Sequence, residues 1–299
     1  MAAIKSIESG PRTLISPAQL SRGRGRVIYW IVLGVMIPLF AALFLFPLYW
    51  MVTGGLKSPS EVIQTPPSLF PAHPAPHNYL TAWNDLGLGR LILNTILYAG
   101  GALIFQVVFD VAAAYALSKL RPVLGNVILF AMLAAMMIPA TVLVLPQYLT
   151  ANSLPFVHLS LLNTPWAIWL PSVANGFNIF ILKRFFDSVP ADLLAAAALD
   201  GAGPFRTLWR VVLPISRPII GVVSIFAAVN VWKDFLWPLL VLSDPSAQTI
   251  NIGLYHLSNG IPEDVFIAAL AIACVPTIVF FLFFQRNIMA GLTAGGVKG

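Results

Sequence analysis

Charged residues are distributed so unevenly along the chain that they leave long apolar stretches between them. Four stretches contain no Asp, Glu, Lys or Arg: residues 27–56, 91–109, 122–182 and 265–285. A transmembrane helix needs about 20 consecutive apolar residues, so each stretch is long enough to cross a lipid bilayer. A soluble fold of this size has no interior that would keep such runs off its surface. The pattern therefore predicts an integral membrane protein.

The longest uncharged stretch holds two spans, because turn-forming and polar residues between positions 150 and 163 interrupt it. With one more span after Arg217-Pro218 the count reaches six, and the predicted fold is an all-α, polytopic membrane protein. The expected spans are about Val27–Val52, Leu91–Leu117, 125–149, 164–182, 218–242 and Val265–Phe284. An even number of crossings places both termini on the same side of the membrane.

The few charges decide which side that is. Only 9% of the 299 residues are charged and 59% are apolar, with a mean hydropathy of +0.86. Fourteen of the 17 Lys and Arg residues fall on the face that holds both termini, so the positive-inside rule predicts that this face is cytoplasmic. The chain then divides into a cytoplasmic arm at 1–26, a six-helix transmembrane domain at 27–285 and a cytoplasmic tail at 286–299. The first span is expected to remain as an uncleaved anchor.

Other classes of function are excluded by what the sequence lacks. The basic residues are dispersed between the spans, unlike the gathered basic patch of a nucleic-acid-binding protein. No G-x-x-x-x-G-K-[ST] loop occurs, so the chain is not expected to bind ATP. The single cysteine, Cys274, allows no intrachain disulfide, and the four histidines show no metal-ligand spacing. With no visible nucleophile and base, the chain is expected to be no enzyme and to hold no cofactor or metal.

One cytoplasmic connection, residues 184–213, is long enough to be a structured element. Ser188 and Pro190 are typical of a helix start, strong helix formers follow, and Gly201 is expected to end the helix. A second short helix is expected from Gly203-Pro204. Its apolar face would consist of Phe205, Leu208, Trp209 and Val212. The Ala-rich first helix suits docking into a groove of another protein, although such a helix can also lie on the membrane surface.

The spacing within this loop resembles a family signature. The segment Ala195-Ala196-Ala197-x-x-Asp200-Gly201-Ala202, followed by Val212-Leu213-Pro214, is similar to the EAA signature of permease subunits in bacterial ATP-binding cassette importers. Further segments resemble the carbohydrate-uptake branch, the type of the smaller maltose permease: Ala114-Tyr115-Ala116, Met137-Ile138-Pro139, Trp232-x-x-Phe235-Leu236-Trp237-Pro238-Leu239 and the tail Gly291–Gly299. The glutamate that opens the family signature is Ala195 here, so docking is expected to rely more on shape, on Asp200 and on the neighbouring helix.

The resemblance implies a type I importer permease fold and a multi-subunit assembly in the bacterial cytoplasmic membrane. It implies a heterodimer with a second permease subunit, two ATP-binding cassette subunits that bind ATP and Mg, and an extracytoplasmic solute-binding protein. The chain itself would contact membrane lipid and no nucleic acid. Residues 195–197 and 200–202 would couple it to the ATPases. The family's last external loop meets the binding protein and its tail reaches the ATPases, and residues 243–264 and 291–299 are the matching stretches.

Polar residues within the predicted spans are candidates for the transport path. Asn230, Asp234 and Trp237 stand at i, i+4 and i+7, so a continuous helix would present two hydrogen-bonding groups and an aromatic plane to a sugar. The alternative is that Trp237 belongs to an aromatic belt at the membrane interface. Asn94 and Tyr98 also share a helix face, although Asn commonly links helices in membranes.

Asp110, in the second span, is expected to be a structural strut to a neighbouring helix rather than a substrate ligand. Two predicted external segments, 53–90 and 243–264, either face a partner or are plain surface loops. An ion-coupled secondary transporter would show inverted repeats and acidic residues near mid-membrane, and Asp110 alone is off centre. The predicted function is therefore a sugar or oligosaccharide permease, and the nearest alternative is a permease of the same superfamily for another solute.

Overall fold

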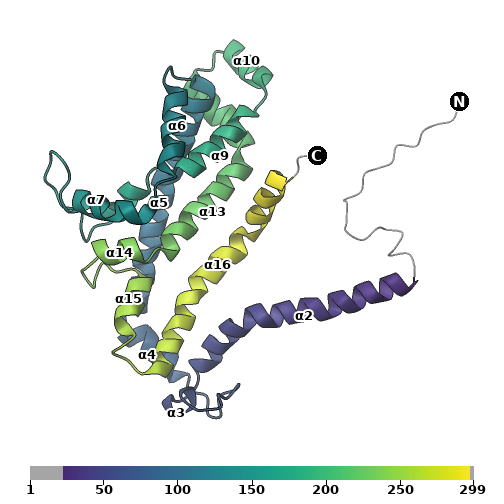
Figure 1. Cartoon of the computed structure of the whole chain (residues 1–299), viewed down its shortest axis with the longest axis vertical. Coiled ribbons are helices and arrows are strands. Elements are labelled where there is room, and N and C mark those ends of the chain that lie inside the picture. The colour runs from purple at the N-terminus through teal and green to yellow at the C-terminus, as the bar shows by residue number, and fades with distance from the viewer. Residues whose placement is uncertain (1–22, 297–299) are drawn as a thin grey trace.

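The computed structural model describes residues 23–296, and every regular element in that range is a helix (Figure 1). The α-helices are α2 (Gly23–Gly54), α3 (Pro59–Val62), α4 (His77–Asp85), α5 (Leu88–Tyr115), α6 (Gly125–Ala135), α7 (Ala140–Asn152), α8 (Trp166–Ser172), α9 (Gly176–Asp187), α10 (Ala191–Leu199), α11 (Pro204–Thr207), α12 (Leu213–Ile215), α13 (Arg217–Lys233), α14 (Leu236–Val241), α15 (Ile250–Leu257) and α16 (Glu263–Gly296). The π-helical turns η1 (Ala116–Leu120) and η2 (Leu208–Val212) continue α5 and α11. The arm up to residue 22 and residues 297–299 lie outside the described range.

Three helices are long and apolar enough to cross a membrane unbroken: Gly25–Gly54, Leu88–Leu120 and Glu263–Gln285. They correspond to the predicted first, second and sixth spans. The last of these helices continues to Gly296, so most of the predicted tail extends it as helix. Two further pairs qualify only if each bent pair is one span, with bends of 106° between α6 and α7 and 84° between the Pro204–Ile215 helix and α13.

The expectation of continuous helices for the third, fourth and fifth spans is wrong, and prolines explain two of the three breaks. A proline has no N–H to bond to the carbonyl four residues earlier. Pro139 therefore cannot donate to the carbonyl of Ala135, which accepts instead from the N–H of Ile138 at 3.1 Å, and α6 ends at Ala135. Pro238 likewise cannot donate to the carbonyl of Asp234, which accepts instead from Asn251 Nδ2 at 3.5 Å, and α13 ends one residue earlier, at Lys233. The fourth span is broken between Ser172 and Gly176, where α8 gives way to α9.

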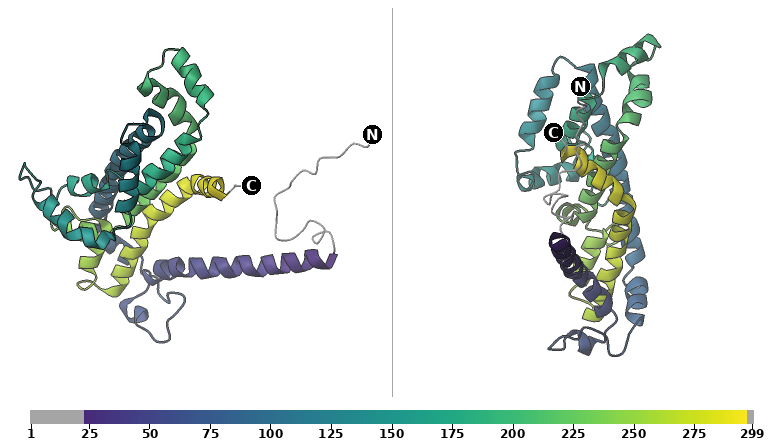
Figure 2. Two further views of the ribbon diagram at one scale, coloured as in Figure 1. Left: turned by 45° about the horizontal axis from the view of Figure 1, so that its top comes forward. Right: turned by 90° about the vertical axis from the view of Figure 1, so that its right-hand side faces the viewer.

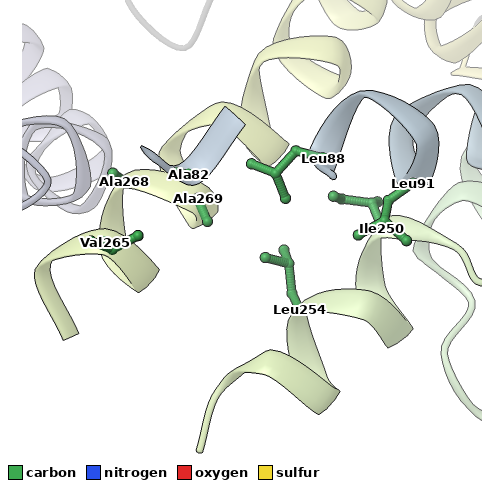
Figure 3. Close-up of a cluster of buried hydrophobic side chains, with 8 residues drawn as sticks. All are labelled: Ala82, Leu88, Leu91, Ile250, Leu254, Val265, Ala268 and Ala269. Atoms are coloured by element: carbon green, nitrogen blue, oxygen red, sulfur yellow. The ribbon is translucent and has the colours of Figure 1, made fainter. Parts of the chain in front are cut away.

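Helix α5 is the centre of the bundle. It packs against α13, α9 and α8 and carries buried residues along its whole length. At one end lies a buried cluster shared with α4, α15 and α16 (Figure 3), which consists of Ala82, Leu88, Leu91, Ile250, Leu254, Val265, Ala268 and Ala269. At the other end α5 shares a second cluster with α9 and α13, which includes Val111, Leu182, Phe186 and Val223. The two clusters fix α5 as the rigid element on which the other helices are placed.

The connector between α2 and α5 is ordered, as its prolines predict. Lys57 is 2% exposed, donates from Nζ to the carbonyl of Ser68, and lies 4.3 Å from the ring centroid of Trp50. Asn78 donates to the carbonyls of Gly55 and Lys57 at 3.1 and 2.9 Å. These bonds tie the connector to the end of α2. Toward its N-terminus α2 extends away from the other helices, and its apolar middle is exposed (Figure 2).

Candidate functional site

A polar pocket lies where two broken helices meet beside α5. It has a volume of about 160 Å³ and is lined by Gln106, Pro171, Ser172, Ala174, Asn175, Asn230, Val231 and Asp234. The residues from 171 to 175 come from the end of α8 and the break that follows it, and those from 230 to 234 come from the end of α13 and the residue after it. Non-helical backbone at membrane depth is tolerated where it lines a cavity, because its polar groups need partners there. The pocket therefore has the structure expected of a polar path through an apolar bundle.

One amide and one carboxyl side chain, those of Asn175 and Asp110, stabilise the α8–α9 break. The Oδ1 atom of Asn175 accepts hydrogen bonds from the backbone N–H groups of Phe177 and Asn178, both at 3.1 Å, and so caps the start of α9. Asp110 of α5 is fully buried, and its Oδ1 atom accepts from the N–H of Asn175 at 3.0 Å. The break is thus fastened to α5, and Asp110 acts as the strut between helices that the sequence suggested.

Replacing Asp110 tests this strut. In Asp110→Leu the part-buried N–H of Asn175 loses its acceptor, which costs about 1–3 kcal/mol, so we expect a lower melting temperature of the purified protein and weaker transport. Asp110→Asn keeps an acceptor oxygen in place and is expected to stay close to the wild type in both measurements. Equal melting temperatures for the wild type and Asp110→Leu would contradict the assignment.

Asn230, Asp234 and Trp237 do not share one helix face, so that prediction is wrong. Helix α13 ends at Lys233, Asp234 is extended with φ −64° and ψ 133°, and Trp237 belongs to α14. Asn230 and Asp234 nevertheless both line the polar pocket. Trp237 does not line it: its Nε1 atom donates to the carbonyl of Ala167 at 2.8 Å and its ring packs on a buried cluster.

Asn94 and Tyr98 share a face of α5, as predicted, but neither lines the pocket. Asn94 donates from Nδ2 to the carbonyls of Ser246 and Gln248 at 2.8 and 3.0 Å. The hydroxyl of Tyr98 donates to the carbonyl of Ala247 at 2.7 Å. Both side chains therefore hold the segment between α14 and α15 against α5, which agrees with the structural alternative left open for Asn94.

Three polar residues of the pocket were not among the candidates: Gln106, Ser172 and Asn175. Gln106 is 5% exposed and lies near the middle of the Leu88–Leu120 helix. The sequence carried a signal for the other two, because Pro171 and the Asn175-Gly176 pair are typical of a helix interruption.

The loop between α9 and α13 lies at the end of the molecule opposite α3 and α4 (Figure 1). Helix α10 ends at Leu199, and Gly201 terminates it as predicted, with a φ of +73°. The N–H of Ala202 bonds to the carbonyl of Ala197 at 2.9 Å, and the N–H of Gly201 to that of Ala198 at 3.0 Å. This pair of bonds is a Schellman cap, which needs a left-handed residue at the position of Gly201.

The expected apolar face of the second loop helix is split. Val212 is fully buried, whereas Phe205 and Trp209 are 77% and 66% exposed. Residues 208–212 form the π-helical turn η2, so the 3.6-residue spacing on which that face was predicted does not hold there. Leu199, at the end of α10, is also 90% exposed. Three large apolar side chains on this loop therefore have no partner within the described chain.

The alanines of the signature are accessible as well. Ala195, Ala196, Asp200 and Gly201 are exposed, while Ala197 and Ala202 are half-buried. The hydroxyl of Tyr115, in α5, donates to the carbonyl of Pro204 at 2.9 Å. The loop is therefore bonded to the central helix that also lines the polar pocket.

The comparisons with known proteins agree on one kind of protein. The family model described as binding-protein-dependent transport system inner membrane component matches residues 110–293. The sulfoquinovosyl glycerol transport system permease protein SmoH of Agrobacterium fabrum (strain C58 / ATCC 33970) is 33% identical, over 85% of this chain and 89% of the relative. The arabinooligosaccharides transport system permease protein AraQ of Bacillus subtilis (strain 168) is 30% identical, over 91% and 97%.

A solved structure shares the fold. One chain of a bacterial ABC transporter involved in the import of the acidic polysaccharide alginate superposes with a TM-score of 0.77 at 23% sequence identity, over 92% of this chain and 99% of that chain. The overall arrangement of the helices is therefore that of a fold that has been determined experimentally.

Proposed function

Because the chain belongs to the family of binding-protein-dependent transport system inner membrane components, we propose that it forms part of the pathway for a sugar or oligosaccharide in an ATP-binding cassette importer. Members of this family are membrane permeases and not enzymes. The observation that carries the proposal is the polar pocket, because it gathers amide and carboxylate side chains at two helix breaks inside an otherwise apolar bundle.

The substrate class follows from the chemistry of the pocket and from the names of the relatives. Amides both donate and accept hydrogen bonds and a carboxylate accepts them, so Gln106, Asn230 and Asp234 together match the hydroxyl groups of a sugar. SmoH and AraQ are named for a glycoside and for oligosaccharides. A permease of the same superfamily for another solute is the alternative, and the ligand of the binding protein separates the two.

Calorimetry of the solute-binding protein against a panel of sugars tests the substrate class. Binding of one sugar or oligosaccharide supports the proposal. If only amino acids or phosphate bind, the sugar assignment is wrong while the family assignment stands.

The loop between α9 and α13 is the proposed contact with the ATP-binding subunits, which would carry ATP and Mg. Residues 195–197 and 200–202 would seat α10 in a cleft of the ATPase, and the exposed side chains of Leu199, Phe205 and Trp209 would extend the contact. This contact would compensate for Ala195, which stands where the family has glutamate. The tail stretch 291–299 would reach the ATPases too, and its side chains lie outside the part of the chain that the structure describes.

The opposite end of the molecule is the proposed external face. There the 243–264 segment, fastened to α5 by Asn94 and Tyr98, would meet the solute-binding protein. Both termini would then be cytoplasmic, in agreement with the charge distribution. A second permease subunit would complete the pathway as a heterodimer. Closure of the ATPases would move the loop and α5 together. This closure would shift the transporter between its two states only if the loop makes different contacts with the ATPases in each state.

The pocket carboxylate provides a direct test of the pathway. Asp234→Ala removes a charged hydrogen-bond acceptor, so we expect the KM of uptake into reconstituted vesicles to rise about tenfold or more. Asp85→Ala is the matched control, because Asp85 is an exposed acidic residue at the end of α4, away from the polar pocket. An unchanged KM in Asp234→Ala would exclude the pocket from the path.

A further inference from the structure

An apolar groove runs between α5, α6 and α9 on the outside of the bundle. It has a volume of about 600 Å³, and its walls include Phe109 and Ala113 of α5, Met132 and Ala135 of α6, and Ile179 of α9. Helix α6 contributes no buried residue to the fold, so its apolar side chains face the groove or the membrane. The groove ends where α6 meets α9, since a Cβ on Gly176 would lie 3.3 Å from the sulfur of Met136.

The length of the groove matches one leaflet. Helix α6 has 11 residues, which corresponds to about 16 Å at about 1.5 Å per residue. The hydrocarbon core of a bilayer is about 30 Å thick, so half of it is about 15 Å. Beyond α6 the chain turns through 106° into α7. The groove thus begins at the predicted cytoplasmic surface and ends near the middle of the membrane.

A second polar pocket, separate from the one beside Asn230 and Asp234, opens at the cytoplasmic end of the groove. Its volume is about 500 Å³, and its polar lining is Ser118, Arg121, Asn126, Lys183 and Asp187. Leu117 and Pro122 line both the pocket and the groove, so the two adjoin each other. A ligand that fills both must have a polar end and an apolar end.

The charges of the pocket favour an anion. Asp187 is already satisfied, because its carboxylate accepts from Lys183 Nζ and from Ser118 Oγ at 2.8 and 2.7 Å. Burial favours its protonated form, but these hydrogen bonds outweigh burial and hold the pKa of the carboxyl below its usual range. Within residues 23–296, the ion pair of Lys183 with Asp187 leaves Arg121 without a carboxylate partner. Arg121 is held at the rim by a bond from Nε to the carbonyl of Ser118 at 3.3 Å.

We propose that this composite site binds one anionic glycerophospholipid, with the phosphate of its headgroup at Arg121 and Asn126 and an acyl chain along the α5–α6–α9 groove. Arginine suits this role because its guanidinium presents several donors to phosphate oxygens, and basic pockets at the cytoplasmic ends of membrane helices are typical headgroup sites. The proposal rests on the cytoplasmic orientation given under the proposed function. The bound lipid would complete the surface of α6 and support the α5–α9 contact below the coupling loop.

Native mass spectrometry of the assembled transporter, purified in detergent, tests the site. After exposure to phosphatidylglycerol and phosphatidylcholine of equal chain length, the wild type is expected to retain phosphatidylglycerol preferentially. Arg121→Gln is expected to weaken that retention about tenfold or more. Arg184→Gln is the matched control, because Arg184 is the neighbour of Lys183 on α9, carries the same charge as Arg121 and does not line the pocket. Its retention is expected to equal that of the wild type.

A second variant tests the groove. Ala135→Trp would fill the groove from α6 and is expected to reduce retention of the lipid with no change at Arg121. Equal retention of both lipids by the wild type, equal loss in Arg121→Gln and Arg184→Gln, or displacement of the lipid by millimolar inorganic phosphate would each overturn the proposal. The measurement uses neither sugar nor ATP, so a wrong substrate assignment would leave its result unchanged.

Discussion

Replacement of Gly201 by valine is expected to abolish substrate-stimulated ATP hydrolysis by the assembled transporter while membrane insertion stays intact. Gly201 has a φ of +73°, which costs a residue with a side chain about 1 kcal/mol or more. No atom lies within 4 Å of a Cβ placed there, so the effect comes from the backbone and not from a clash. Helix α10 has only nine residues and buries none of them, so the Schellman cap is a main constraint on its end.

Valine would force residue 201 out of the left-handed region and break the bonds that Gly201 and Ala202 donate to the last turn of α10. The exposed side chains of Leu199 and Phe205, on either side of the turn, would then change their relative positions. A contact that must distinguish two states of the ATPase depends on that arrangement. Substrate-stimulated ATP hydrolysis in proteoliposomes measures the effect, and expression and membrane localisation serve as the check on folding.

Gly203→Val is the matched control. Gly203 is two residues away, has a φ of −68° and ψ of 170°, and has no atom within 4 Å of an added Cβ. Valine fits that extended backbone, especially before a proline, so stimulation is expected to persist. Gly201→Asn should fall between the two, because asparagine tolerates the left-handed region better than valine. Full stimulation in Gly201→Val would exclude the cap from coupling.

The sequence predicted best the elements that depend on local information alone. Helix α5 with its continuation η1, and helix α16, are long and apolar, and the predicted second and sixth spans fall within them. The end of α10 followed from a single glycine. Pro139 and Pro238 were visible in the sequence, but hydropathy averages over such residues, so the third and fifth spans were predicted as continuous helices.

The site was predicted less well because its residues meet only through tertiary structure. Asn230 and Asp234 were selected on the assumption of a continuous helix, and they reach the pocket although that assumption is wrong. Asn175 joins them because Asp110, 65 positions earlier in the chain, accepts its N–H. Trp237 does not line the pocket, because its indole N–H donates to the carbonyl of Ala167. No spacing along the chain encodes these long-range pairs.

Substitution of Gly101 is expected to have the largest effect on folding of any single glycine in α5. A Cβ at this position would overlap the indole ring of Trp169, whereas a Cβ on its neighbour Gly100 would meet no atom within 4 Å. Trp169 has little freedom to move, because its Nε1 atom donates to the carbonyl of Tyr98 at 3.2 Å and its ring packs against Phe105 with centroids 5.6 Å apart. Gly101 therefore permits the close approach of α8 to α5.

Two alanine variants separate this packing from helix propensity. Alanine favours a helix over glycine by about 1 kcal/mol, and this gain applies equally at both positions. Gly100→Ala is thus expected to be neutral or stabilising. In Gly101→Ala the overlap should cost about 1–3 kcal/mol, which exceeds the gain, and Gly101→Leu should leave little folded protein. Melting temperatures of the purified variants measure the difference.

The displacement would also reach the polar pocket beside Asn230 and Asp234, because Pro171 and Ser172, two and three residues after Trp169 in α8, form one of its walls. Uptake by Gly101→Ala is therefore expected to fall even at a temperature at which the protein stays folded, whereas Gly100→Ala should transport normally. If the two variants had equal melting temperatures and equal uptake, the α5–α8 contact would not be what holds the broken helix in place.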